Sequence, residues 1–368
     1  MDWVDLVRRH VPRSVRFAVQ RIVPVSALKL RYFERRNPLA EVTRGDSSRV
    51  DVPVRVGIFR NRAQFHTAFI AACQEIGVPF RVIDLYGDDW LERTREAACD
   101  IHVAWPDATS TPAAKVIKDR LDLLERDVGL RILPTAEERW MYEDKVRLAD
   151  WLRCRSIKHP YTWVFHERHR AEAFAASCRL PIVTKTSFGA AATGVRVLHS
   201  RRQVRATVAR AFGRGVRADG ADVRDRQWDV VLFQEHVDIV HEWRLVRIGD
   251  AYFGHPKGRH GGFHSGSGKV EWNLPSARHL DLLHAVTEAG GFRSMALDAF
   301  ETPMGELLVN ELQTVFGAGV SVDQMKRDGE AGRMVRDVDG WRFEPGDFAR
   351  NACANARILD ALERWTPP

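Results

Sequence analysis

The chain has 368 residues, with 56 Lys+Arg, 49 Asp+Glu and a formal net charge of +7. Hydrophobic residues make up 45% and charged residues 29%, which excludes disordered and collagen-like classes. No run approaches ~18 apolar residues, so we expect no membrane-spanning helix. The first ten residues lack the order of a signal peptide, and the five cysteines form no CxxC. We therefore expect a cytoplasmic protein without a zinc site or disulfide framework.

The positive charge is concentrated at the start of the chain. Residues 1–50 hold 11 Lys+Arg and 5 Asp+Glu, a net of +6, which leaves +1 for the other 318 residues. Because residues 3–36 interleave arginine with apolar side chains, one interpretation places residues 1–36 on an anionic membrane surface. The other is a helical arm packed on the body or on a partner subunit. The near-neutral body has no basic stripe, so we expect no nucleic-acid partner.

Residues 41–51 are polar and indicate a linker. After it, 54–60, 80–85 and 99–105 are expected to be strands, and 64–77 a helix that ends at Gly77. This βαβ pattern predicts a small parallel sheet. No GxGxxG follows the first strand, so dinucleotide binding has no support.

Further along, residues 115–128 indicate a helix and 131–135 a short strand. Thr135 and Glu138 form a capping box that begins a helix carrying Trp140, Lys145 and Leu152. From 161 to 235 we expect strand, helix, strand, Gly-rich loop, strand, helix, strand. Residues 242–313 should be mainly strands, with hairpins over 241–259 and 295–317 and a helix near 277–290. A final amphipathic helix is expected at 347–365.

Lys185 stands at the end of an apolar strand, before a loop of small residues from Ser187 to Gly194. Such a loop lets backbone N–H groups approach a phosphate, and the lysine adds a point charge. A plain hairpin turn needs only two to five residues, which makes that alternative weaker. The segment 262–269 resembles a phosphate-binding GxxxxGK[ST] loop but has Phe263 and Val270 where the motif needs Gly and Ser or Thr.

Acidic side chains gather on the second predicted hairpin. Glu311 and Gln313 are two residues apart on one strand, so they face the same side of the sheet, and Asp298 can face them from the other strand. Oxygen ligands from adjacent strands suit Mg²⁺, which combines one or two carboxylates with substrate phosphates. The alternative for any one of these acids is a solvated strand residue.

Taken in order, these pieces resemble the ATP-grasp superfamily over residues 136–320, with 54–134 similar to the domain that precedes the nucleotide fold. The closest pattern is that of RimK-like and D-alanine-ligase-like carboxylate–amine ligases. The resemblance implies an α/β (α+β) ATP-grasp fold with an N-terminal βαβ pre-ATP-grasp domain. Its implied segments are a basic arm (1–50), the pre-ATP-grasp domain (51–134), a small lobe (135–237), a C-terminal lobe with the metal site (238–346) and a C-terminal helix (347–368).

The same resemblance implies the ligands ATP and Mg²⁺ and assigns residues to them. Glu242 would hold or lie near the ribose, and Arg259 is an alternative to Lys257 at the phosphates. Arg244 and Lys185 would stabilise charge on the transferred phosphoryl group, and the metal would be held by Asp298, Glu311 and Gln313. The implied ATP-binding residues are Lys145, Lys185, Ser187, Gly189, Gly194, Gln234, Glu235, His236, Val237, Glu242 and Lys257.

The implied reaction activates a carboxylate as an acyl phosphate and joins it to an amine. Small-molecule or polymer-borne substrates fit, such as an amino acid, a peptide or an acidic sugar of a surface polysaccharide, and homodimers are common in such ligases. The last motif departs from the usual Glu-x-Asn, because Gln313 stands in place of Asn. One alternative is therefore a catalytically impaired nucleotide-binding module docked to a membrane or partner by the basic arm. In the Gly-rich loop 254–268, a histidine (His255, His260 or His264) is either a general base or merely solvated.

Overall fold

The computed structural model describes residues 54–189, 194–219, 221–258, 273–316 and 325–365. They form two compact units, one of residues 108–113 and 161–236 and the other of the remaining described residues. The predicted N-terminal arm, Arg259, His260 and His264 lie outside the described residues. Within the described ranges, no helix is both long enough and apolar enough to cross a bilayer.

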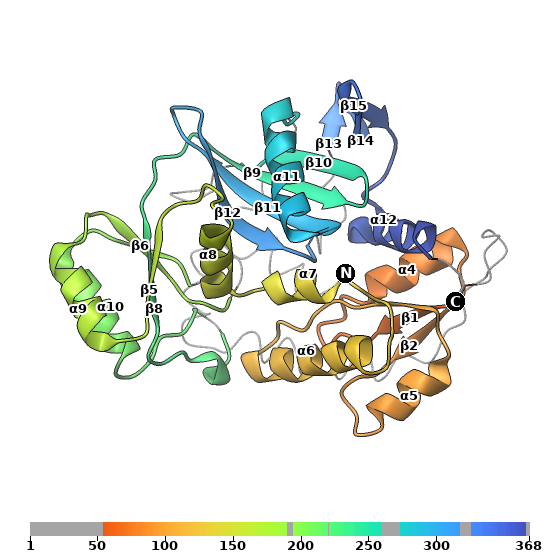
Figure 1. The fold of residues 1–368 in the computed structure, drawn as a ribbon, viewed down its shortest axis with the longest axis horizontal. Helices are drawn as coiled ribbons and strands as arrows, with labels where there is room; N and C mark the ends of the chain where they lie inside the picture. The colour runs from red at the N-terminus through yellow and green to blue at the C-terminus, as the bar shows by residue number, and fades with distance from the viewer. Residues whose placement is uncertain (1–53, 190–193, 220, 259–272, 317–324, 366–368) are drawn as a thin grey trace, which may run out of the picture. The chain divides into compact units, whose positions relative to one another are not determined.

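The second unit begins with the predicted parallel sheet, ordered β2-β1-β3-β4. Its strands are β1 (Val56–Phe59), β2 (Phe80–Ile83), β3 (Ile101–Val103) and β4 (Ile132–Leu133). Helices α5 (Trp90–Ala97) and α6 (Thr111–Arg126) cover one face, and α4 (Thr67–Ile76) and α12 (Arg350–Glu363) cover the other (Figure 1). Helix α4 ends at Gly77 with φ 85, so the predicted stop is confirmed.

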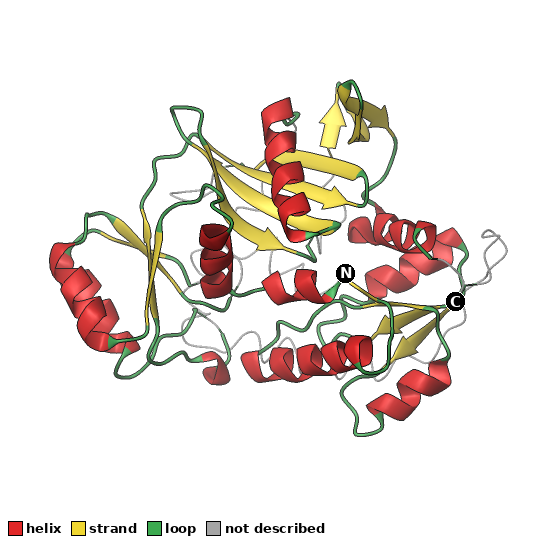
Figure 2. Cartoon of the chain, in the orientation of Figure 1, coloured by secondary structure: helices red, strands yellow, loops and turns green. Residues whose placement is uncertain are grey.

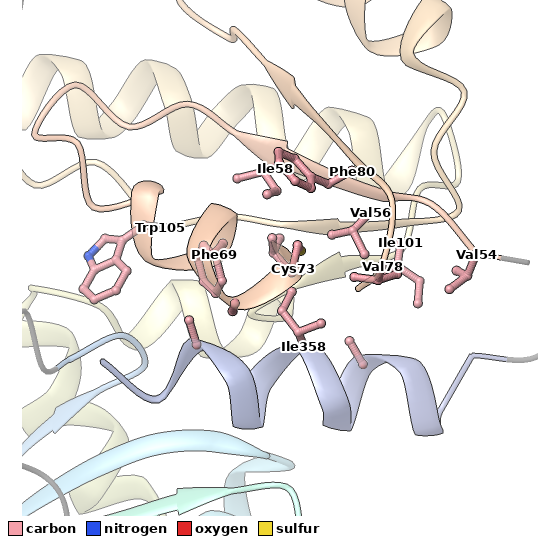
Figure 3. Packing of buried hydrophobic residues seen from close by; sticks show 14 of the residues in the cluster. Val54, Val56, Ile58, Phe69, Cys73, Val78, Phe80, Ile101, Trp105 and Ile358 are labelled. Carbon is pink, nitrogen blue, oxygen red and sulfur yellow. The ribbon is translucent and has the colours of Figure 1, made fainter. Parts of the chain in front are cut away.

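The chain's C-terminal helix is part of the core around β1. Ile358 of α12 points toward Cys73 and Phe69 of α4 (Figure 3). All three side chains are at most 1% exposed. Strand β1 is buried on both faces, because Val56 and Ile58 pack toward α4 while Phe59 packs in the cluster with α6. This two-sided burial explains why the strand is continuously apolar in sequence.

The second unit also holds a large antiparallel sheet, ordered β12-β11-β9-β10-β14-β13, with β15 paired to β14. The predicted hairpins are β9 (His241–Ile248) with β10 (Ala251–Pro256), and β11 (Ser294–Glu301) with β12 (Leu307–Gln313). The predicted helix is α11 (Ala277–Gly290), which lies across one face of the sheet (Figure 2). Strands β13 (Met325–Arg327), β14 (Glu330–Asp337) and β15 (Gly340–Pro345) were not predicted.

The single helix predicted from residue 136 past Lys145 was wrong. It is split into α7 (Ala136–Met141) and α8 (Lys145–Cys154). The capping box of Thr135 and Glu138 is present at the start of α7. Glu143 has φ 55, and the Asp144 carboxylate accepts hydrogen bonds from the backbone N–H groups of Val146 and Arg147, so Asp144 caps a new helix. Both helices group with the second unit, whereas the predicted small lobe began at residue 135.

The first unit contains a four-stranded antiparallel sheet, ordered β5-β8-β6-β7. Its strands are β5 (Thr162–Phe165), β6 (Ile182–Lys185), β7 (Arg196–Leu198) and β8 (Val231–Glu235). Helices α9 (Arg168–Ser177) and α10 (Arg201–Ala211) lie beside each other and share a core with the sheet (Figure 1). The predicted order of elements over 161–235 is confirmed.

Candidate functional site

The loop that follows Lys185 is held at its base by two hydrogen bonds. The backbone N–H of Thr186 donates to the Gly194 carbonyl (3.2 Å), and the N–H of Ser187 donates to Oε1 of Gln227 (2.9 Å). A Cβ on Gly194 would lie 2.0 Å from Oγ1 of Thr186, so any larger residue requires Thr186 to move. Gly189 has φ 129, a conformation that favours glycine. Residues 190–193 lie outside the described residues.

The predicted adenine hinge begins in strand β8. Gln234 is buried, and its amide donates to Oγ1 of Thr162 in β5 (3.0 Å). Glu235 is exposed, its carboxylate accepts from the Tyr161 backbone N–H (2.9 Å), and its own N–H donates to the Tyr161 carbonyl. His236 is exposed and Val237 is half-buried. Gln234 therefore joins two strands of the first unit, and Glu235 and His236 lie at the surface of that unit.

In the second unit, four residues with ionisable side chains form a row across the large sheet. Strand register places His255 opposite Arg244, Arg244 opposite Asp298, and Asp298 opposite Glu311. Paired residues share one face, and Trp243 and Leu245, which alternate with Arg244, pack instead in the cluster that contains α11. The predicted carboxylates and Arg244 therefore occupy the face of the sheet opposite α11.

Arg244 and Asp298 of this row join Lys257 and Glu242 in a network of two basic and two acidic residues. Arg244 makes a two-pronged contact with Asp298, from Nε to Oδ1 (2.9 Å) and from Nη2 to Oδ2 (3.0 Å). Lys257 donates to Glu242 (2.8 Å) and also to Asp298. Glu242 and Asp298 are each 2% exposed. Burial alone would raise the pKa of Asp298, but Arg244 and Lys257 outweigh it and hold the pKa below the ordinary aspartate value.

A second polar cluster lies where α8 meets β12. Lys145 begins α8, and its Nζ is 3.6 Å from Oε1 of Glu311. The Gln313 amide donates to Oε1 of Glu311 (3.1 Å) and to Oε1 of Glu143 (3.2 Å). Burial raises the pKa of the Glu143 carboxyl, the Lys145 ammonium opposes that rise, and Glu311 adds to it. The fold thus brings together three predicted site residues that are far apart in the sequence, namely Lys145, Glu311 and Gln313.

The donor chemistry fits a hard cation at Glu311 and Gln313 better than at Asp298. Mg²⁺ prefers oxygen ligands, usually one or two carboxylates beside substrate phosphates. Both Asp298 oxygens already accept from Arg244 or Lys257. By contrast, the buried Oε2 of Glu143 has no hydrogen-bond partner in the structure. Across the described ranges, no group of three or more His, Cys, Asp or Glu side chains could hold a metal ion.

Sequence reasoning missed Glu143. A continuous helix would have placed it on a turn beside Trp140 and Lys145, with no reason to face β12. The available signal was Asp144. An aspartate just before a helix is a preferred cap, because its carboxylate accepts hydrogen bonds from the backbone N–H groups two or three residues later. That signal predicts a helix beginning at Lys145 and a turn just before it.

Three solved structures are similar to this chain along most of its length. N5-carboxyaminoimidazole synthetase from Staphylococcus aureus, complexed with ADP, is 11% identical and has a TM-score of 0.55, covering 88% of this chain and 80% of that chain. The carboxyaminoimidazole ribonucleotide synthase of Aspergillus clavatus, complexed with ATP, is 11% identical and has a TM-score of 0.54, covering 85% of this chain and 78% of that chain. D-alanine–D-alanine ligase from Bacillus anthracis, complexed with ATP, is 15% identical and has a TM-score of 0.50, covering 71% of this chain and 86% of that chain. No protein-family profile and no curated protein sequence matches the chain. The similarities concern the fold, and they confirm the predicted ATP-grasp architecture.

Proposed function

We propose that this chain, which has the ATP-grasp fold, is an ATP-dependent ligase that joins a carboxylate to an amine. The observation that supports the proposal most is the arrangement around β12. Lys145 approaches Glu311, the adjacent strand carries Asp298, and the next carries Arg244, all in register. Phosphoryl transfer needs little covalent chemistry from a protein, and positioned cations and carboxylates are its usual requirement.

In the first unit, we assign the phosphates of ATP to the Lys185 loop. The base of this loop is fixed by the hydrogen bonds of Thr186 and Ser187, and Gly194 stands where a side chain would press on Thr186. A loop of small residues exposes N–H groups to an anion, and Lys185 adds positive charge. We assign the adenine to the segment Gln234–Val237, where Glu235 and His236 are exposed.

In the second unit, Lys145 and Arg244 are assigned to phosphate oxygens and Glu242 to the ribose. Glu311 and Gln313 are assigned to Mg²⁺, with Asp298 as the further predicted ligand. When bound, Mg²⁺ would neutralise the charge on the β- and γ-phosphates. Arg244 and Lys257 contact Asp298 and hold its pKa below the ordinary aspartate value, so Asp298 is ionised and oriented without a bound substrate.

The proposed reaction has two balanced steps. A substrate carboxylate oxygen attacks the γ-phosphorus of ATP, and the bond to the bridging oxygen breaks to give an acyl phosphate and ADP. The amine nitrogen then attacks the acyl carbon, phosphate leaves, and the amine loses a proton. Lys185 and Arg244 would stabilise the negative charge on the transferred group. The carboxylate belongs to an amino acid, a peptide or an acidic sugar in this proposal.

Hydroxylamine trapping tests the first step without knowledge of the natural amine. The full chain is incubated with ATP, Mg²⁺, hydroxylamine and pools of carboxylates, and hydroxamate and ADP are measured together. We expect both products in equal amounts for at least one pool. Lys185→Ala should abolish both, while Lys158→Ala, at a side chain that is 71% exposed, should not. Full activity in Lys185→Ala would refute the assignment.

The second candidate is a nucleotide-binding module that has lost ligation and docks through its basic N-terminal segment. The net charge of +6 in residues 1–50 favours it. Co-sedimentation with anionic vesicles should then require those residues. If the full chain and a chain beginning at residue 51 sediment equally, membrane docking is dropped.

A further inference from the structure

Glu143 is a buried carboxylate in an unusual backbone conformation. Its φ of 55 lies in the left-handed region, which a glutamate rarely adopts. The residue is 7% exposed. It sits in the turn between α7 and α8, where the Asp144 cap starts the new helix and frees Glu143 from helical geometry. Such outliers persist where the surroundings fix them, and they often occur at functional sites.

The contacts of Glu143 are incomplete. Its Oε1 accepts from the Gln313 amide, which also donates to Glu311. Its Oε2 is buried and has no hydrogen-bond partner in the structure. A buried charged oxygen without a partner is costly, so carboxylates in such places are normally neutralised by a proton or bound to a cation.

Charge around this group favours a cation. Glu143 and Glu311 together carry two negative charges when ionised, and Lys145 is the positive group placed beside Glu311. The network on the neighbouring strands pairs two acids with two bases. Counted over Glu143, Glu311 and Lys145 alone, the cluster at β12 has one negative charge in excess when both carboxylates are ionised. Gln313 lies between these two carboxylates.

We propose that Glu143 is a further ligand for the divalent cation assigned to Glu311 and Gln313, a role that rests on the proposed function. The longer arm of Gln313, compared with the asparagine usual in this motif, lets its amide reach both carboxylates. Turning that amide over exchanges Nε2 for Oε1, which converts the hydrogen-bonded trio into three oxygen donors. The ligand set is then two carboxylates and an amide, with substrate phosphates completing it.

Mn²⁺ binding to the full chain tests this role with a readout other than activity. Free Mn²⁺ is followed by electron paramagnetic resonance in the presence of ADP, and ADP affinity is measured separately without metal. The variants are Glu143→Gln and Glu311→Gln, and the matched control is Glu137→Gln, which removes the same charge from an exposed position on α7.

We expect both Glu143→Gln and Glu311→Gln to lower Mn²⁺ affinity about tenfold or more, with metal-free ADP affinity unchanged. Glu137→Gln should leave both affinities unchanged. Because the neutral amide relieves an uncompensated charge, Glu143→Gln should also keep or raise the metal-free melting temperature. If it fails to fold, Glu143→Asp replaces it, with the same loss of Mn²⁺ affinity expected from the shortened arm.

Two results would overturn the assignment, and they are distinguishable. If Mn²⁺ affinity stays within about twofold of wild type in the Glu143 variant but falls in Glu311→Gln, the metal site stands and Glu143 is not part of it. If the unmodified chain binds neither ADP nor Mn²⁺ with ADP, the proposed function fails together with this inference.

Discussion

At the scale of single residues, Gly194 shows how the loop after Lys185 depends on the absence of a side chain. Gly194→Ala places a methyl group where Oγ1 of Thr186 now lies, with Cβ of Thr186 also at 3.0 Å. Overpacking of this kind typically costs about 1–3 kcal/mol, and here it would also open the base of the loop. We expect weaker ATP binding by calorimetry and a lower melting temperature.

Removing the obstructing atom provides the control for Gly194→Ala. Thr186→Ala in the same chain deletes Oγ1 and Cγ2, so the double variant should recover part of the lost affinity. If Gly194→Ala binds ATP as tightly as wild type, the close approach is not a constraint on nucleotide binding.

Arg244 supports a second residue-scale prediction, because its partner Asp298 is almost fully buried. Arg244→Met leaves that carboxylate with Lys257 as its remaining ionic contact among those described here. Breaking a buried pair from one side typically costs about 3–5 kcal/mol when the other charge is left unpaired, and the remaining Lys257 contact should keep the loss at or below the lower end of that range. Urea unfolding should therefore show a loss of about 3 kcal/mol or less. Arg168→Met, which removes an exposed pair with Glu172, should change the free energy of unfolding much less. Equal small losses in both variants would mean that the network is not structural.

The sequence predicted which strands carry the site residues and which of these residues share a face. It did not predict which side chains form ion pairs or hydrogen bonds with them. Alternation along 294–313 was enough to predict that Asp298, Glu311 and Gln313 share a face. It could not show that Asp298 is engaged by Arg244 and Lys257, because that depends on how β9, β10 and β11 order themselves in the sheet. Nor could it show the left-handed Glu143, which follows from a helix break.

At the scale of elements, α12 is a C-terminal helix that completes the core of the parallel sheet. Ile358 is fully buried against α4 (Figure 3), while the next residue, Leu359, is 46% exposed. Ile358→Ala should lower the free energy of unfolding by about 2–5 kcal/mol. Leu359→Ala should change it by no more than about 0.5 kcal/mol. Comparable effects at both positions would show that the helix does not dock as described.

Element-level prediction worked where local signals and tertiary packing agree. The stop of α4 at Gly77 and the capping box at Thr135 are local and were predicted correctly. The helix from residue 136 was predicted too long because the apolar spacing of Leu148 and Leu152 continues that of α7, and the Asp144 cap was overlooked. Strands β13 to β15 carry mixed polar residues and were not recognised, since strand patterns are weak where little is buried.

At the scale of the whole molecule, a buried histidine makes stability depend on pH. Burial lowers the pKa of His102 from 6.5 to about 4. Its ring stacks on that of Phe59, with 5.4 Å between the ring centroids. Because its folded pKa is lowered, the contribution of His102 is fully present above pH 6.5 and is lost as the pH falls toward 4. The free energy of unfolding should therefore drop between pH 7.5 and pH 5.

The variant that isolates this effect is His102→Leu, which cannot titrate. Burial also lowers the pKa of His66 to about 4. Because His66 remains in both proteins, some pH dependence should persist. The drop in urea-unfolding free energy should be smaller in the variant than in wild type. An identical drop in both would assign the pH dependence to other groups.

Charge at this scale separates the chain into parts with different roles. The +7 of the whole chain lies mainly in residues 1–50, and the body is nearly neutral. The proposed chemistry therefore depends on individually placed groups, chiefly Lys145, Lys185 and Arg244 with the acids around β12, rather than on a general attraction for polyanions.

The proposed function requires the chain to bind ATP through Lys145 and Lys185. Isothermal titration of the full chain with ATP and Mg²⁺ measures this binding, with Lys145→Ala, Lys185→Ala and the exposed control Lys158→Ala. We predict one binding site in wild type, affinity reduced about tenfold or more in each of the first two variants, and no change in the third. Absence of binding in wild type, or equal affinity in all four proteins, would refute the proposed ATP site.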